Sequence, residues 1–166
     1  MYLYLARPIV ISVIVIISII TFHRNHIWVD EVTFWRDVVK KSPMKARPHN
    51  EVGRAISSHN KENIGEAIGE FLFAIKLDPQ TPGHYMNLGH AYIYIGAFEQ
   101  AIEMENKAIS MDAGWADPYY SLALAYELLG KKDEAIKNWE VFLKLSEEED
   151  KWTENAKRHL RNLTTN

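Results

Sequence analysis

The sequence predicts an all-α protein: a right-handed solenoid of about three and a half helix-turn-helix repeats with a capping helix, behind one long apolar N-terminal helix. Three observations predict it. Small and aromatic residues recur 34 positions apart, apolar residues within each period follow helical spacing, and the first 22 residues carry a single charged side chain. The 166 residues have room for one domain and an accessory segment.

The composition excludes several functional classes. The net charge of −3 shows no basic excess of the kind that nucleic-acid binding requires. The absence of cysteine removes disulfides, thiolate metal sites and cysteine nucleophiles. We therefore expect no nucleic-acid partner and no thiol chemistry.

Residues 1–28 are predicted to form an apolar helix that is either a membrane anchor or the core of an oligomer. The uncharged run from Ile9 to Phe22 spans only about 21 Å. Extension to Tyr2 gives about 31 Å, close to the thickness of the hydrocarbon core of a bilayer. A signal peptide is disfavoured because a basic start and a small-residue cleavage site are missing. The residues expected to face lipid or another copy are Ile9, Val13, Ile16, Ile17 and Ile20.

Two irregular units are expected at the start of the array. Residues 29–45 are predicted to be the second helix of a half-repeat, because Trp35 precedes Phe71 by 36 positions, which is one period plus two. The first full repeat, residues 46–81, therefore contains two extra residues. We place them in the polar turn Ser57–Asn63.

Residues 82–115 and 116–149 are predicted to be regular repeats. In the first of them an apolar stripe on one helix ends at Gly96, and a second helix runs from Glu99 to Ile109. Residues 150–166 are predicted to be an amphipathic capping helix, which an open solenoid end requires. Its apolar face contains Trp152, Ala156, Leu160 and Leu163.

The two regular units resemble the tetratricopeptide-repeat (TPR) family. That motif has a large residue, Leu-Gly and Tyr on its first helix, and alanines and an aromatic residue on its second. The small residues allow two helix backbones to approach closely. The first unit fits less well, Glu105 stands where an aromatic residue is usual, and Ala113 replaces the usual proline. The matching residues are Tyr85, Leu88, Gly89, Tyr92, Ala101 and Ala108, then Tyr119, Leu122, Ala123, Tyr126, Ala135 and Trp139.

A second resemblance covers about 30 residues at the start of the array. Arg24 to Glu31, Phe34 to Asp37 and Lys41 to Pro43 are similar to the junction between the last membrane helix and the TPR array in bacterial transmembrane-and-TPR O-mannosyltransferase-like proteins. The catalytic membrane domain of that family has no counterpart in this sequence. The resemblance implies that the apolar helix leads almost directly into the array.

No motif predicts catalysis, a cofactor or a metal site. His23 and His26 are three apart, but no carboxylate or third histidine joins them at ligand spacing. The acidic run Glu147–Asp150 lacks the glycine-containing loop of a calcium site and is interpreted as a solvated helix end. Phosphate-binding loops and hydrolase motifs are absent. We therefore expect a protein that is not an enzyme.

The TPR resemblance implies a concave groove lined by the first helix of each unit, which would bind a protein or peptide with an apolar stripe. The alternative is that these residues are merely exposed on stacked helices. A chaperone-type carboxylate clamp is not expected, because Asn50, Asp117 and Ser121 stand where basic residues are required. The predicted groove residues are Arg47, Asn50, Arg54, Met86, Asn87, His90, Tyr94, Tyr120, Leu124 and Glu127.

Three functions follow from these features. The first is a membrane-anchored interaction scaffold. The second is a structural subunit of a filament or homo-oligomer with residues 2–22 in its core, and the third is an accessory subunit of a membrane glycosyltransferase system. Positive charges flanking the helix favour a cytoplasmic array, but the junction resemblance implies the outside. We expect the array outside the cytoplasm, or in an extracellular filament.

Overall fold

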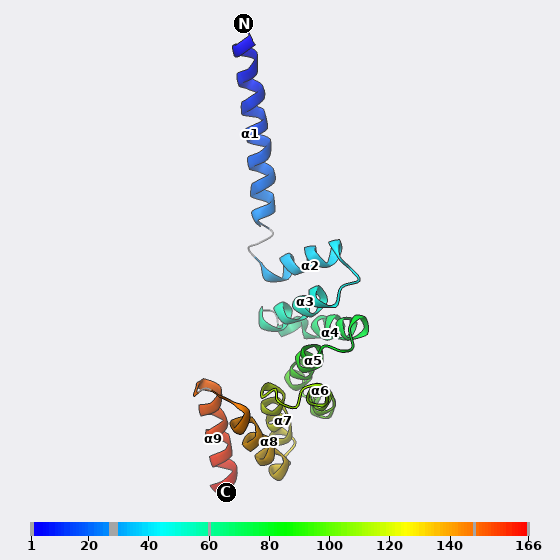
Figure 1. The fold of residues 1–166 in the computed structure, drawn as a ribbon, viewed down its shortest axis with the longest axis vertical. Helices are drawn as coiled ribbons and strands as arrows, with labels where there is room; N and C mark the ends of the chain where they lie inside the picture. Colours follow the sequence, from blue (N-terminus) through cyan, green and yellow to red (C-terminus); the bar gives the residue numbers. More distant parts are fainter. Residues whose placement is uncertain (1, 27–29, 60, 148, 166) are drawn as a thin grey trace.

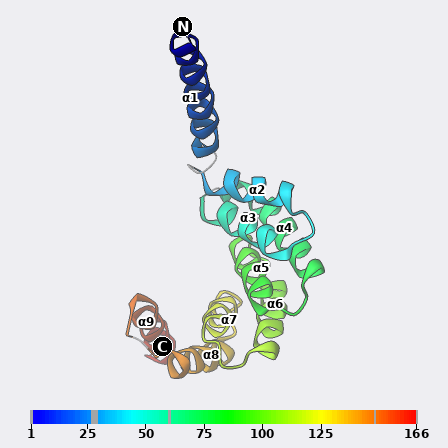
Figure 2. The same ribbon diagram turned by 45° about the horizontal axis from the view of Figure 1, so that its top comes forward.

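The computed structural model describes residues 2–26, 30–59, 61–147 and 149–165, and the side chains of α1 from Val10 to Phe22. Within these residues every regular element is helical. Helices α2 to α9 stack into a curved array, and α1 (Tyr2–His26) projects from its N-terminal end (Figures 1 and 2). The predicted all-α helical array is confirmed.

The array is built from helix pairs. In each pair the two helices pack side by side, and the second helix then packs on the first helix of the next pair. Successive first helices also touch, so α3, α5 and α7 share one face of the array. The helices are α2 (Glu31–Lys41), α3 (Ala46–His59), α4 (Ile64–Leu77), α5 (Pro82–Tyr94), α6 (Phe98–Met111), α7 (Asp117–Leu128), α8 (Lys132–Leu145) and α9 (Lys151–Thr165).

The turns form where the residue pattern places them. Gly96 and Gly130 follow the C-terminal caps of α5 and α7, and both have positive φ angles, of 78° and 72°. Residues with a Cβ rarely adopt that conformation, so glycine ends each helix at low cost. The polar turn of the first repeat is longer and contains a short 3₁₀ helix, η1 (Lys61–Asn63).

Two clusters of apolar side chains hold the array together. At the N-terminal end, Ile56, Phe71 and Leu88 come from three different helices and are almost completely buried, and partly buried residues of α2 pack on them. At the C-terminal end, Trp139 and Phe142 of α8 pack with Ala156 of α9. The helices therefore gain most of their stability from these contacts between units rather than from their own propensity.

The capping helix differs in one respect from the sequence prediction. Ala156 is fully buried and Leu160 and Leu163 pack on the C-terminal cluster, as expected. Trp152, predicted on the same apolar face, is 50 % exposed. It lies in the first turn of α9, next to the segment that joins α8 to α9.

Helix α1 is long, but the prediction that it crosses a membrane is not supported. Among the residues described, no helix combines the length and the apolar character that a membrane crossing needs. The described side chains of α1 end at Val10 and Phe22, a stretch of about 20 Å, whereas a hydrocarbon core is about 30 Å thick. The side chain of Ile9 and residue Trp28 lie outside the described part.

The apolar side chains of α1 are exposed. The large ones from Val10 to Phe22, which include Val13, Ile16, Ile17 and Ile20, have exposed fractions between 48 and 67 %. No other described helix packs along α1 in the way that α2 to α9 pack on one another.

Candidate functional site

The concave face begins with polar residues of α3 and α5. Asn87 Nδ2 donates to Asn50 Oδ1 at 3.0 Å, which joins two of the predicted groove residues across adjacent units. Arg54 is exposed, but its guanidinium pairs with Glu51 at 3.0 Å and with Glu31 at 3.9 Å. Because both partners are acidic, this end of the groove is less positive than the sequence alone suggests.

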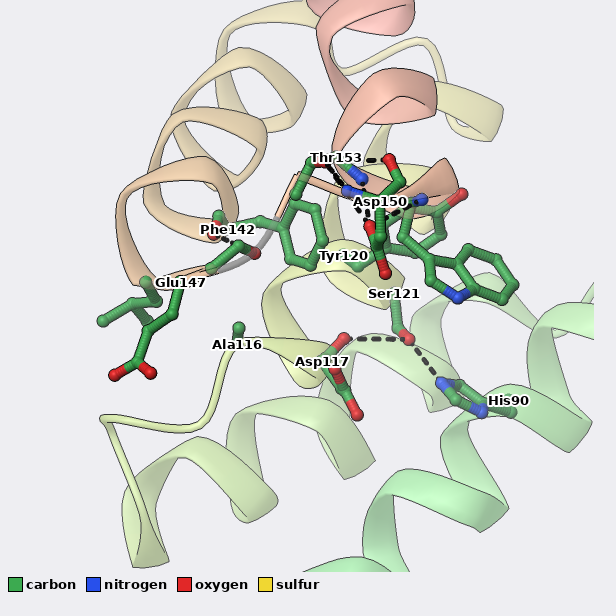
Figure 3. Close-up of a pocket in the computed structure, with 12 residues that line it drawn as sticks. His90, Ala116, Asp117, Tyr120, Ser121, Phe142, Glu147, Asp150 and Thr153 are labelled. Carbon is green, nitrogen blue, oxygen red and sulfur yellow. Dashed lines mark hydrogen bonds between the residues drawn. The ribbon is translucent and has the colours of Figure 1, made fainter.

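A pocket of about 510 Å³ lies at the C-terminal end of the concave face (Figure 3). Four helices contribute to it: α5, α7, α8 and α9, with the segment between α8 and α9. Its lining combines aromatic rings with carboxylates and hydroxyls. The lining residues are His90, Ala116, Asp117, Tyr120, Ser121, Phe142, Leu145, Ser146, Glu147, Asp150, Trp152 and Thr153.

Tyr120 is the central aromatic residue of the pocket. Its ring meets the rings of Trp139, Phe142 and Trp152 edge to face, at centroid distances of 4.8, 5.1 and 5.5 Å. Its hydroxyl accepts a hydrogen bond from Asn155 Nδ2 at 2.5 Å. Tyr120 is therefore held by α8 and α9 together, and its position is set before any ligand binds.

His90 and Ser121 form a polar part of the lining. His90 Nε2 and Ser121 Oγ lie 2.6 Å apart and share a hydrogen bond whose direction depends on the tautomer of His90. Ser121 Oγ also donates to the Asp117 carbonyl oxygen at 3.4 Å.

Glu105 of α6 lies behind this pair. Its side chain is fully buried, its two carboxyl oxygens have no hydrogen-bond partner, and Oε1 is 3.9 Å from His90 Nε2. Burial raises the pKa of Glu105 to about 9, and the Asp117 charge raises it further. Burial also lowers the pKa of His90. Both groups are neutral near pH 7, so their contact is not an ion pair.

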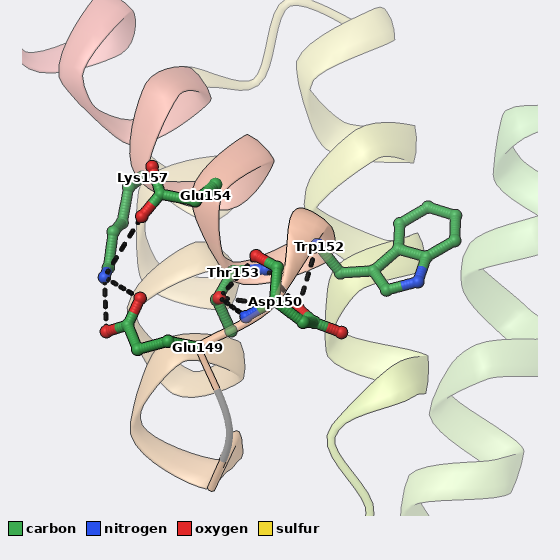
Figure 4. Close-up of polar contacts among 6 residues, drawn as sticks. All are labelled: Glu149, Asp150, Trp152, Thr153, Glu154 and Lys157. Atoms are coloured by element: carbon green, nitrogen blue, oxygen red, sulfur yellow. Dashed lines mark hydrogen bonds and ion pairs between the residues drawn. The ribbon is translucent and has the colours of Figure 1, made fainter.

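The start of α9 is fixed by reciprocal hydrogen bonds (Figure 4). Asp150 Oδ1 accepts from the backbone N–H groups of Trp152 (2.9 Å) and Thr153 (3.0 Å), and the Asp150 N–H donates to Thr153 Oγ1 at 2.9 Å. These bonds lower the pKa of Asp150. These bonds give acceptors to N–H groups of the first turn that have no partner within the helix. The fixed first turn orients Trp152 toward the pocket.

A surface ion pair also stabilises the start of α9. Lys157 Nζ binds both carboxylate oxygens of Glu149 at 2.6 Å, and Glu154 lies 3.7 Å away. Figure 4 shows that these three side chains lie on the side of α9 away from Trp152. The ion pair therefore supports the turn without occupying the pocket.

The structure brings some of the predicted groove residues into the pocket and gives others structural partners. His90 and Tyr120 line the pocket. Glu127 accepts from Trp139 Nε1 at 3.3 Å and contacts His159 Nδ1 at 2.9 Å, and Leu124 packs on the C-terminal cluster. Arg47 is exposed on α3, Met86 and Asn87 are half-buried on α5, and Tyr94 is 50 % exposed at the end of α5.

The sequence did not indicate that residues of α8 and α9 line the pocket. Phe142, Asp150 and Trp152 all line the pocket but were assigned to the core, a solvated run and a capping helix. The one available signal was an aromatic residue in the first turn of the last helix, next to acidic residues. The described residues contain no cluster of potential metal ligands.

An array of paired helices with a closing helix at its end defines a helical-repeat protein. A tetratricopeptide repeat family matches residues 85–114 and 116–148. The chain therefore contains tetratricopeptide repeats.

Relatives and solved structures agree with this family. The chain is 33 % identical over 94 residues to the human protein O-mannosyl-transferase TMTC3, a match that covers 57 % of this chain and only 10 % of the relative. The other O-mannosyl-transferase that matches is from mouse, so the expected bacterial origin gains no support.

Two solved structures illustrate the fold. The first TPR of Spaghetti (RPAP3), bound to the HSP90 peptide SRMEEVD, is 26 % identical with a TM-score of 0.66, covering 73 % of this chain and 91 % of that one. The protein MamA is 25 % identical with a TM-score of 0.64, covering 69 % and 66 %.

Proposed function

We propose that this chain is a non-catalytic scaffold that binds a segment of another protein in the concave groove of α3, α5 and α7. The observation that carries the proposal is the pocket around Tyr120, whose aromatic side chain is positioned by hydrogen bonding and ring contacts from two other helices. Rigid aromatic residues in a concave site suit an apolar stripe on a peptide or helix.

The similarity to RPAP3 supports a peptide ligand, although not an acidic one. The solved RPAP3 domain is bound to a peptide that ends in Glu-Glu-Val-Asp. Here the corresponding face carries Asn50, Ser121 and Asp117 in places where a carboxylate clamp needs basic residues, and no lysine or arginine lines the pocket. The groove therefore suits a segment of different charge.

Site-specific photo-crosslinking tests the proposal. A benzophenone amino acid replaces His90, which lies in the groove, or Lys137, which is exposed on α8 outside the pocket lining. Both variants are irradiated with a random library of biotinylated peptides. We expect selective labelling from position 90. Equal labelling from both positions, or labelling from neither, would contradict groove binding.

Helix α1 supports a second role, self-association. Its side chains from Val10 to Phe22 expose apolar surface all around the helix, and a helix of that kind is normally covered by other protein or by lipid. We propose that the α1 helices of several copies pack together as the core of an oligomer or filament. The TPR arrays would then lie outside this core.

The self-association proposal has a direct test. Sedimentation and negative-stain microscopy compare the chain without detergent with an Ile16→Lys/Ile20→Lys variant. We expect oligomers or regular fibres from the unmodified chain and monomers from the variant. Monomers from both would exclude self-association, and the same assemblies from both would assign it to another surface. An accessory role beside a glycosyltransferase rests on the O-mannosyl-transferase similarity alone and stays a prediction.

A further inference from the structure

The pocket at the C-terminal end of the groove is negatively charged. Asp117, Glu147 and Asp150 line it, with no lysine or arginine among the lining residues. The lining also contains His90. Desolvation lowers the pKa of this histidine below its ordinary value, so it is neutral near pH 7. The three carboxylates of the lining outnumber the cation beside them, Lys151, which acts on Asp150. The excess of negative charge favours a cationic ligand.

The three carboxylates remain available to a ligand. Asp117 and Glu147 form no ion pair with a described residue, and both are exposed. Each hydrogen bond from the α9 N-terminus to the Asp150 carboxylate uses Oδ1, which leaves Oδ2 open. Lys157 is held by Glu149 on the opposite side of α9, whereas Lys151 precedes Trp152 in the chain and lowers the pKa of Asp150.

The aromatic residues beside these carboxylates suit the stem of a long basic side chain. Tyr120, Phe142 and Trp152 form the apolar part of the lining. Lys151 Nζ already lies 4.8 Å from the centroid of the Trp152 ring, so this ring accepts an ammonium group within the chain itself. Aromatic rings with a carboxylate rim match the aliphatic stem and charged end of lysine or arginine.

An independent observation comes from behind the lining. Glu105 is completely buried, and neither of its carboxyl oxygens has a hydrogen-bond partner. Its carboxyl is directed toward His90, 3.9 Å away, and His90 and Ser121 separate it from the pocket. Glu105 is neutral near pH 7 and adds no charge to the pocket. An acidic ligand would add negative charge next to the three carboxylates of the lining, whereas a cation would be attracted to them.

We propose that this pocket binds a lysine or arginine side chain of the protein segment that occupies the groove, next to an apolar residue of that segment. The inference rests on the proposed groove function and specifies its ligand. It separates this chain from repeats that recognise an acidic peptide end.

Selection from a random phage-displayed peptide library tests the inference. The full chain, kept in a mild non-ionic detergent, is compared with an Asp117→Asn/Glu147→Gln variant. Asp150 is left unchanged because it caps α9. The matched control is Asp133→Asn/Glu140→Gln, which removes one exposed carboxylate from the first turn of α8 and another from the exposed face of the same helix.

The expected result is enrichment of peptides with lysine or arginine beside an apolar residue. Their affinity should fall about tenfold in the pocket variant and stay unchanged in the control, and replacing the basic residue by norleucine should produce a similar loss. Enriched peptides that lack a basic preference, or that bind the pocket variant equally well, would overturn the inference and leave groove binding intact. No enrichment, or peptides that crosslink outside the groove, would overturn both.

Discussion

The same buried position is occupied by different chemistry in successive repeats. Phe71, Glu105 and Trp139 are spaced 34 residues apart on α4, α6 and α8, and their exposed fractions are 1, 0 and 0 %. Phe71 fills the space beside Gly53, and Trp139 packs in the C-terminal cluster with Ala123. Glu105 instead places a carboxyl against Gly89.

This comparison shows that the repeat geometry depends on size more than on polarity. A small residue on the first helix and a larger one on the second fit together in all three units, so the backbone can repeat although one side chain is acidic. In the middle unit Glu105 stays protonated, because burying an ionised and unpaired carboxylate would cost far more free energy. The result is a polar group placed directly behind the groove.

Truncation of the aromatic members should have the largest effect. Phe71→Ala and Trp139→Ala each remove a large buried side chain and should lower the free energy of unfolding by about 3–5 kcal/mol. Glu105→Ala should cost clearly less, because it also removes an unpartnered polar group. Urea denaturation followed by circular dichroism measures all three. A Glu105→Ala variant as unstable as Trp139→Ala would show that polarity does not distinguish the middle unit.

The second prediction concerns pH. The folded pKa of Glu105, about 9, is above the ordinary value of 4.5, so the folded state binds more protons than the unfolded state between these values. The contribution of Glu105 therefore favours folding below pH 4.5 and is lost as pH rises toward 9. The loss is about 1.4 kcal/mol per pH unit, on the order of 3 kcal/mol by pH 7.

Comparison with Glu105→Gln isolates this contribution. His84 and His90 have pKa values lowered by burial, and their contributions are lost as pH falls below 6.5, but they are present in both proteins. The difference in unfolding free energy between the two proteins should change steadily in favour of the glutamine variant from pH 5 to pH 9. A difference independent of pH would mean that Glu105 is ionised in the folded protein.

The third prediction tests the fit between the small and large residues. A Cβ at Gly89 would lie 2.4 Å from Glu105 Oε1, and one at Gly53 would lie 2.6 Å from the Phe71 ring. Both alanine substitutions should destabilise by about 1–3 kcal/mol through overpacking. In a Glu105→Ala background the cost of Gly89→Ala should disappear, because the clashing atoms are gone. An unchanged cost in the double variant would disprove the contact.

The smallest effect is expected at a glycine outside this interface. Gly69 lies within α4, and no heavy atom lies within 4 Å of a Cβ built there. Gly69→Ala should therefore stabilise the protein by about 0.5–1 kcal/mol through helix propensity. Gly96→Ala is the opposite control, because its φ of 78° strains any residue with a Cβ. Thermal unfolding of both variants should show shifts of opposite sign.

The helices and their turns could be predicted because their signals are local. An apolar stripe at spacings of three and four defines each helix, and Gly96 and Gly130 have the positive φ that their position after a helix predicts. The sequence places the extra residues of the first repeat in the polar turn Ser57–Asn63, but Ser57 to His59 belong to α3, and only Lys61–Asn63 form the short helix η1. The membrane interpretation of α1 gains no support, because the described helices do not combine the length and apolar character that a membrane crossing needs.

The amino-acid sequence by itself determined the helical repeat, the order of its units and the small residues that let them stack. Only the tertiary structure decided what the groove contains: that Trp152 and Asp150 of the last helix join Tyr120 in one pocket, and that Glu105 lies behind His90. The reason is physical. Helical periodicity depends on neighbours three or four residues away, whereas the pocket depends on the angles at which successive helices pack, and those angles result from the whole set of buried contacts.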